Sequence, residues 1–125
     1  MANPNIVNVS TINGNTAVAT LNTLSLTGGS ATVNVISNAA SSNKILKLNT
    51  LALTNFTASN TTTYVSINRS GTQYYLAGYL LTPFFSTTFL TSKTESIYLM
   101  EGDTLQANTS VNNSISLIAS FDEIS

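Results

Sequence analysis

Apolar and polar side chains alternate most regularly near the C-terminal third of this chain. The alternation runs from Ile97 to Met100 and resumes from Thr104 to Ala107, with Gly102 between the two runs. Glycine readily takes the positive φ that a tight turn requires. Period-two alternation on both sides of such a turn predicts a β-hairpin over residues 97–108.

A second pattern predicts a long strand with a fault in its phase. Leu46 and Leu48 would share one face of this strand, whereas Leu51 and Leu53 would fall on the opposite face. The change of phase at Asn49-Thr50 predicts a β-bulge, or alternatively a strand that is buried on both sides.

Three further segments carry strand and turn signals. Residues 63–82 predict a hairpin in which Gly71 takes the left-handed position of a type I turn with a bulge. Residues 18–37 hold two alternating runs around Gly28-Gly29, which suggests a two-residue hairpin turn. Residues 114–121 predict the last strand of the chain.

Strands at a spacing of roughly 8–12 residues, with no helical period between them, predict an all-β domain. We expect an antiparallel β-sandwich or jelly-roll-like single domain over residues 18–125. Residues 1–17 are repeatedly interrupted by Asn and Gly. This segment predicts an extended N-terminal arm that lies on a neighbouring subunit, and the alternative is a short edge strand of the same sandwich.

Two apolar segments are candidates for contacts with other subunits. One is the arm, and the other follows a proline that cannot donate to a β-ladder. If the aromatic residues after this proline are exposed they mark a contact surface, and if buried they close one end of the sandwich. The candidate contact residues are Ile6, Val7, Val9, Ile12, Pro83, Phe84, Phe85 and Phe89.

Composition excludes several classes of function. Only 7% of the residues are charged, against roughly 25% in an average soluble domain. Asn, Ser and Thr together make up 53 of the 125 residues. Four scattered cations cannot neutralise a phosphate backbone, so we expect no nucleic-acid binding. No apolar run approaches 18 residues, so we expect no membrane span.

The chain contains neither Cys nor His, which removes disulfides, thiolate sites, the usual general base and the commonest metal ligand. No Gly-rich phosphate loop or serine–lysine motif occurs either. We therefore expect no enzyme activity, no catalytic residues and no cofactor. The sole metal candidate is a Ca²⁺ site made of Glu101, Asp103, Asp122 and Glu123. The simpler interpretation of Glu101 and Asp103 is that both are solvated turn residues.

An aromatic cluster also has two interpretations. Tyr64, Tyr74, Tyr75 and Tyr79 lie in the predicted hairpin. They favour cross-strand packing, and the alternative is a platform for a carbohydrate or a nucleobase.

Several stretches resemble the small virion structural proteins of tailed phages, especially phages of marine cyanobacteria. The resemblance is carried by residues 1–7, 44–51, 74–77, 97–105 and 120–125, and it consists of scaffold residues. It implies a capsid decoration (cement) protein, a homotrimer that bridges subunits of the major capsid protein on the surface of a virion assembled in the host cytoplasm. The alternatives are a tail, neck or fibre component, and a carbohydrate-binding receptor module.

Overall fold

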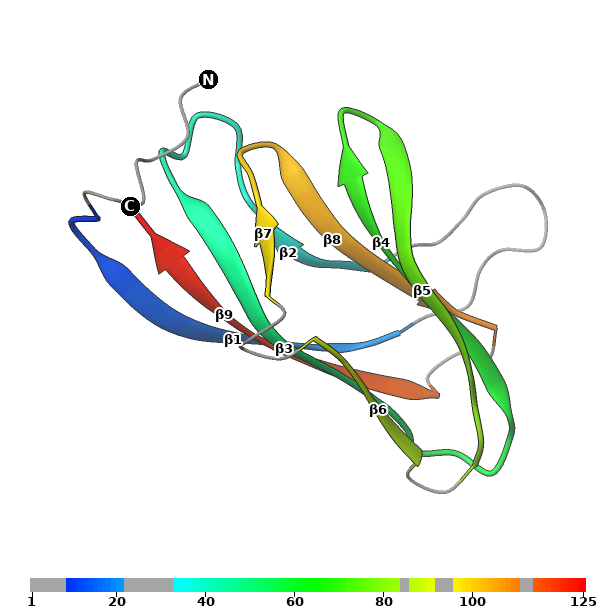
Figure 1. The fold of residues 1–125 in the computed structure, drawn as a ribbon. Helices are drawn as coiled ribbons and strands as arrows, with labels where there is room; N and C mark the ends of the chain where they lie inside the picture. The colour runs from blue at the N-terminus through cyan, green and yellow to red at the C-terminus, as the bar shows by residue number, and fades with distance from the viewer. Residues whose placement is uncertain (1–8, 22–32, 84–85, 92–95, 111–113) are drawn as a thin grey trace.

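The protein folds into β-strands joined by loops (Figure 1). The structure is a computed structural model that describes residues 9–21, 33–83, 86–91, 96–110 and 114–125. The strands in these residues are β1 (Ile12–Thr20), β2 (Val33–Ser37), β3 (Ile45–Asn55), β4 (Thr61–Arg69), β5 (Thr72–Leu81), β6 (Ser86–Thr91), β7 (Ile97–Leu99), β8 (Asp103–Thr109) and β9 (Ile115–Ile124).

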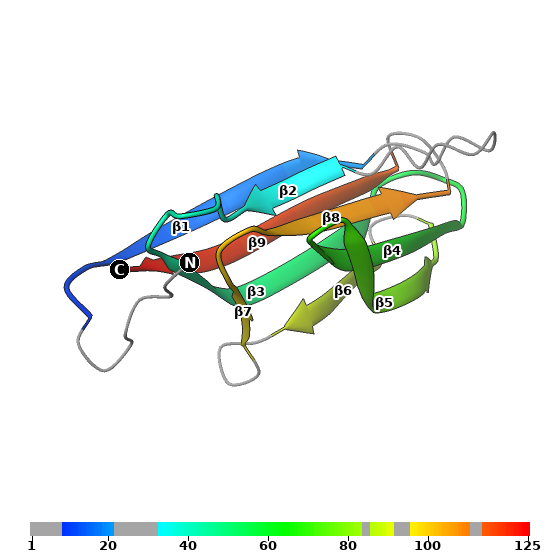
Figure 2. The same cartoon turned by 90° about the horizontal axis from the view of Figure 1, so that it is seen from above.

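These strands form two antiparallel sheets that pack against each other (Figures 1 and 2). The five-stranded sheet has the order β1-β9-β3-β6. β7 and β6 lie along the same edge of β3, where β7 pairs with its first half and β6 with its second half. The four-stranded sheet has the order β2-β8-β4-β5. The predicted antiparallel β-sandwich is therefore confirmed.

Leucine dominates the core between the sheets. The inward positions of β3 and β9 alternate with outward ones, as expected for strands with one buried face. Burying one such aliphatic side chain contributes roughly 1.5–3 kcal/mol. The fully buried apolar side chains of the strands are Leu48, Leu51, Leu53, Val65, Leu99, Leu105, Ile115, Leu117 and Ala119.

The phase fault in β3 is a β-bulge. Leu48 pairs with Phe121 and Thr50 with Ser120, so that Asn49 is an extra residue in β3. The bulge brings the leucines before and after it to the same buried face. The prediction of a bulge is thus confirmed, and the alternative of a strand buried on both faces is wrong.

β4 and β5 form the hairpin that the sequence predicts. Arg69 pairs with Thr72, which leaves Ser70 and Gly71 as a two-residue loop. Both loop residues have positive φ, 53° and 84°. Two positive φ angles belong to a type I′ turn, whose twist matches that of the strands, so the predicted type I turn is wrong.

The predicted hairpin over residues 97–108 is also wrong, although Gly102 takes the expected positive φ of 86°. β7 pairs with β3 in one sheet, and β8 pairs with β2 and β4 in the other. The turn therefore carries the chain from sheet to sheet. Alternation shows that Leu99 and Leu105 point inward, but it cannot show that they do so from opposite sides of the core.

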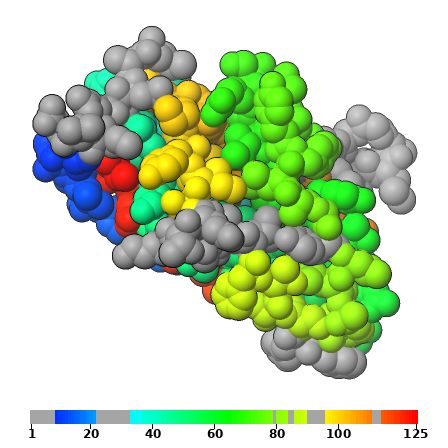
Figure 3. Space-filling model, in the orientation of Figure 1, coloured from blue at the N-terminus to red at the C-terminus, as the bar shows by residue number. Residues whose placement is uncertain are grey.

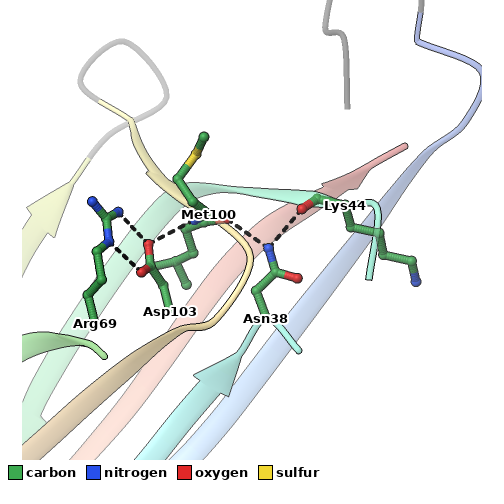
Figure 4. Close-up of polar contacts among 6 residues, drawn as sticks. Asn38, Lys44, Arg69, Met100 and Asp103 are labelled. Atoms are coloured by element: carbon green, nitrogen blue, oxygen red, sulfur yellow. Dashed lines mark hydrogen bonds and ion pairs between the residues drawn. The ribbon is translucent and has the colours of Figure 1, made fainter. Parts of the chain in front are cut away.

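A second crossing loop, between β2 and β3, is bonded to this turn (Figure 4). The Asn38 side-chain amide donates to the carbonyls of Lys44 and Leu99, at 2.8 and 3.0 Å. The backbone carbonyl of Asn38 in turn accepts from the Gly102 N–H at 2.8 Å. A single buried side chain thus joins the two places where the chain changes sheet at this end of the sandwich.

The N-terminal region combines described and undescribed parts. Residues 12–17 belong to β1, which pairs with β9 along its whole length and is an edge strand of the sandwich. For this part of the predicted arm the alternative of an edge strand holds, whereas residues 1–8 lie outside the described residues. The Gly28-Gly29 turn also lies outside them, and the flanking β1 and β2 belong to different sheets.

Candidate interaction surfaces

The outer face of the five-stranded sheet carries an exposed apolar row. Val18 of β1 pairs with Ile118 of β9, which pairs with Ala52 of β3, which pairs with Phe89 of β6. Directly paired residues lie on the same face of a sheet. Val18, Ile118 and Phe89 are exposed, and Ala52 between them is half-buried. The row crosses four neighbouring strands without interruption.

Hydroxyl side chains flank this apolar row on both sides. One flanking row consists of Thr20, Ser116, Thr54 and Thr87, and the hydroxyls of the last two lie 3.0 Å apart. Of the outward positions that the structure describes on this sheet, only Lys47 and Asp122, nearer one end, carry a charge. The apolar row can therefore be covered without removing an ion from water.

Two of the predicted contact residues lie exposed on this face, namely Phe89 and Ile12. Ile12 is at the beginning of β1 and pairs with Ile124, which also pairs with Ile45. Val9 and Pro83 are half-buried. The remaining predicted contacts lie outside the described residues: Ile6, Val7, Phe84 and Phe85. Sequence reasoning missed Val18 and Ile118, because an apolar residue at an outward strand position looks like one at an inward position until the pairing is known.

The outer face of the four-stranded sheet has a different chemistry. One row across its four strands consists of Asn34, Gln106, Ser66 and Tyr75. The next row consists of Ser37, Thr104, Asn68 and Gln73. Amide and hydroxyl groups thus occupy neighbouring positions on all four strands.

Hydrogen bonds connect the amides of these two rows. Gln106 donates its Nε2 to Asn34 Oδ1 at 2.8 Å, and its Oε1 accepts from Gln73 Nε2 at 3.2 Å and from Asn68 Nδ2 at 3.4 Å. The Tyr75 hydroxyl donates to Gln73 Oε1 at 3.4 Å. The network holds the amide groups in defined orientations.

Two tyrosines stand beside this network. Tyr64 and Tyr75 are both exposed, and their rings meet edge to face with centroids 6.2 Å apart. Tyr64 pairs with Gly78, where a Cβ atom would come within 3.0 Å of the Tyr64 ring. The missing side chain at Gly78 therefore leaves room for the ring.

Of the other two tyrosines of the predicted cluster, Tyr74 lies apart from this pair. Tyr74 is exposed but is the sequence neighbour of Tyr75, and it pairs with Ile67, so it points to the other side of the sheet. The side chain of Tyr79 lies outside the described residues. A sugar platform requires aromatic rings that are exposed and close together, and Tyr64 and Tyr75 are both exposed and in mutual contact. The space-filling view shows β4 and β5, which carry these tyrosines, along one side of the molecule (Figure 3).

The acidic residues of the turn at Gly102 are buried, so the interpretation of Glu101 and Asp103 as solvated residues is wrong. Asp103 accepts two bonds from the Arg69 guanidinium, 2.7 Å from Nε and 2.6 Å from Nη2, and a third from the Met100 N–H at 2.9 Å (Figure 4). Glu101 accepts from the Asn43 N–H at 2.9 Å. Both carboxylates serve to hold the crossing loops.

Electrostatics agree with a structural role for the Asp103 carboxylate. Its hydrogen bonds and its negative charge raise the pKa of Arg69, so the guanidinium stays protonated. Glu123 of β9 pairs with Lys44, just before β3, at 3.4 Å. No group of three or more acidic side chains gathers around a possible metal position in the described part of the chain. The structure thus does not bring Glu101, Asp103, Asp122 and Glu123 together as a Ca²⁺ site.

Comparison with known proteins adds no assignment to these surfaces. No protein-family model matches the chain, and no curated protein matches it significantly. Among the residues that the structure describes, no helix is long and apolar enough to cross a membrane.

Proposed function

We propose that this chain is a non-enzymatic structural protein of a phage virion, which decorates the capsid and attaches through the outer face of its five-stranded sheet. The sequence resemblance supports the virion, and the exposed apolar row Val18–Ile118–Ala52–Phe89 supports the attachment face. In this role the protein bridges neighbouring subunits of the major capsid protein and resists the pressure of the packaged DNA.

The chemistry of the face suits attachment to another protein. Apolar surface contributes about 25 cal/mol per Å² when it is removed from water, before the costs of association. The hydroxyls beside the row carry no charge, so covering them requires only that their hydrogen bonds be replaced. If the protein is a homotrimer, three such faces bind the shell together, and linkage raises the apparent affinity above that of one contact.

Cryo-electron microscopy of virions that carry this protein tests the location. Decoration predicts density over the whole capsid shell at a constant ratio to the major capsid protein. Density confined to the tail, neck or fibres would overturn the decoration role and support the alternative structural role.

A pair of matched variants tests the attachment face. Phe89 is 67% exposed on the five-stranded sheet, and Leu80 is 68% exposed on β5, where it pairs with Thr62 on the other sheet. We expect Phe89→Asn to weaken co-sedimentation with capsids stripped of this protein at least tenfold, whereas Leu80→Asn leaves it unchanged. Both variants should keep the thermal midpoint of the parent. Equal effects of the two variants, or no effect of Phe89→Asn, would reject this face as the attachment site.

A further inference from the structure

The outer face of the four-stranded sheet is a regular array of neutral polar groups with an aromatic pair. None of the outward positions that the structure describes on β2, β8, β4 and β5 carries a charge. The one basic residue in these strands, Arg69, is bonded to the buried Asp103 instead. This face therefore differs from an average protein surface, of which charged residues make up a large part.

We propose that this face binds a neutral oligosaccharide, with Tyr64 and Tyr75 as the stacking platform and the Gln73–Gln106 amides as the hydrogen-bonding groups. A sugar ring has an apolar C–H face and a rim of hydroxyls that both donate and accept. Exposed aromatic rings match the first feature, and side-chain amides, which carry a donor and an acceptor on one planar group, match the second. This binding is independent of the attachment role proposed above.

The site is organised before a ligand arrives. Gln106 and Gln73 are held through the bonds to Asn34, Asn68 and Ser66. Because their side chains are already ordered, binding costs less rotamer entropy than it would on a surface of free amides. Neighbouring strands are about 4.8 Å apart, so a row of four side chains spans roughly 14 Å, enough for a short oligosaccharide.

A polar atom without a partner supports the assignment. Asn108 pairs with Tyr64 across β8 and β4, and its Oδ1 atom is buried with no hydrogen-bond partner. A buried acceptor of this kind costs free energy, and a donor from a bound molecule beside Tyr64 would satisfy it.

The same chemistry argues against other ligands. Nucleic acids and anionic polysaccharides require cations, and this face presents none at its described outward positions. A protein partner would need a continuous apolar centre, and the exposed aliphatic residue here is Leu80, separated from the amide rows by Tyr64 and Gly78.

The test uses the full chain and defined probes. Backbone amide shifts are followed by NMR while neutral hexasaccharides of glucose, xylose, mannose and N-acetylglucosamine are added in turn, with a heparin hexasaccharide as the anionic comparison. We expect at least one neutral probe to shift residues of β4, β5 and β8, with little effect from heparin. Absence of shifts up to millimolar concentrations of all neutral probes, or stronger shifts with heparin, would overturn the proposal. A second copy of the chain covering this face, seen as a dimer with broadened β4 and β5 signals, would overturn it as well.

Matched tyrosine variants locate the binding on this face. Tyr64 and Tyr98 are equally exposed, at 41%, but Tyr98 pairs with Lys47 on the five-stranded sheet. We expect Tyr64→Ala and Tyr75→Ala each to weaken binding of the active probe at least tenfold, and Tyr98→Ala to leave it unchanged. Thermal melts confirm that each variant is folded. Unchanged affinity in folded Tyr64→Ala and Tyr75→Ala, or an equal loss in Tyr98→Ala, would overturn the assignment.

Discussion

The outer faces of the two sheets belong to one sandwich and share one core, yet they differ in chemistry. The outer face of the five-stranded sheet exposes to solvent a row of aliphatic and aromatic side chains between rows of hydroxyls. The four-stranded sheet shows an amide network beside two tyrosines. Inward positions are constrained by the common core, whereas outward positions are not. The different side-chain chemistry of the two outer faces therefore indicates what kind of partner each face can bind.

On these proposals, each outer face of the sandwich has a separate partner. If the apolar face lies on the shell of a particle, the amide face of the same sandwich points away from the shell. A protein that decorates a particle in this way would present its tyrosine pair to the surroundings. The two faces can be tested separately, because Phe89→Asn changes only the apolar face and Tyr64→Ala changes only the amide face.

Deletion of Asn49 should have the largest effect, because the bulge keeps both halves of β3 in phase with the core. Without Asn49, Leu46 and Leu48 would turn outward and Lys47 would turn toward the core. Exposing two leucines costs roughly 3–6 kcal/mol, which is comparable with the whole stability of a small domain. We expect the deletion variant to lose the cooperative thermal transition in circular dichroism.

A substitution at the same position is the matched control for this deletion. Asn49→Ala keeps the chain length and removes only the 3.0 Å hydrogen bond to Asp122, at a cost of about 1 kcal/mol. A deletion variant that melts like this control would show that the bulge does not set the phase of β3.

Two neighbouring residues of β9 should separate the core from the outer face. Leu117 is fully buried, and Ile118 lies in the exposed apolar row. We expect Leu117→Ala to lower the free energy of unfolding by about 3 kcal/mol in urea, and Ile118→Ala to change it by less than about 1 kcal/mol. An equal loss at Ile118 would mean that this side chain contributes to folding of the isolated chain, which would weaken the case for a partner there.

Asp103→Asn should show that the Asp103–Arg69 ion pair, at the end of the four-stranded sheet, stabilises the fold. The amide cannot accept all three bonds from Arg69 and Met100, so we expect a loss of about 2 kcal/mol in the free energy of unfolding. The control is Glu123→Gln, because the Glu123–Lys44 pair is partly exposed and should contribute less than about 1 kcal/mol. If the two variants lose equal stability in urea, burial of Asp103 does not strengthen its pair.

The sequence predicts the fold class and several local features of this protein. The phase of the leucines in β3 places the bulge at Asn49-Thr50, where the structure has it, and the spacing of turns indicates a sandwich. The sheet to which each strand belongs is not contained in such patterns. β7 and β8 look like a hairpin because alternation reports only that one side of each strand is buried.

The candidate surfaces were only partly predictable for the same reason. Phe89 and Ile12 were recognisable as possible contacts, but the row that joins Phe89 to Val18 exists only through long-range pairing. The amides show the same limit, since Asn34 and Gln106 are 72 residues apart in sequence yet bond to each other. A carboxylate next to a glycine at a turn, such as Asp103, is usually solvated, and only the crossing of the chain between sheets explains its burial.

Gly78→Ala should have the smallest effect on stability and the most specific effect on one face. Alanine suits a strand better than glycine by roughly 0.5–1 kcal/mol, but its Cβ would lie within 3.0 Å of the Tyr64 ring. These two contributions oppose each other, so we expect the free energy of unfolding to change by less than about 1 kcal/mol. The ring must tilt, and the aromatic NMR signals of Tyr64 and Tyr75 should both shift.

The matched control is Gly14→Ala in β1, where the nearest atom to an added Cβ is Asp122 Oδ1 at an ordinary 3.7 Å. This variant should leave both tyrosine signals and oligosaccharide binding unchanged, because it lies on the five-stranded sheet. Gly78→Ala should weaken oligosaccharide binding several-fold while attachment to the capsid stays normal. If its tyrosine signals do not move, the ring is not held over Gly78. If capsid attachment falls instead, the assignment of one partner to each face is wrong.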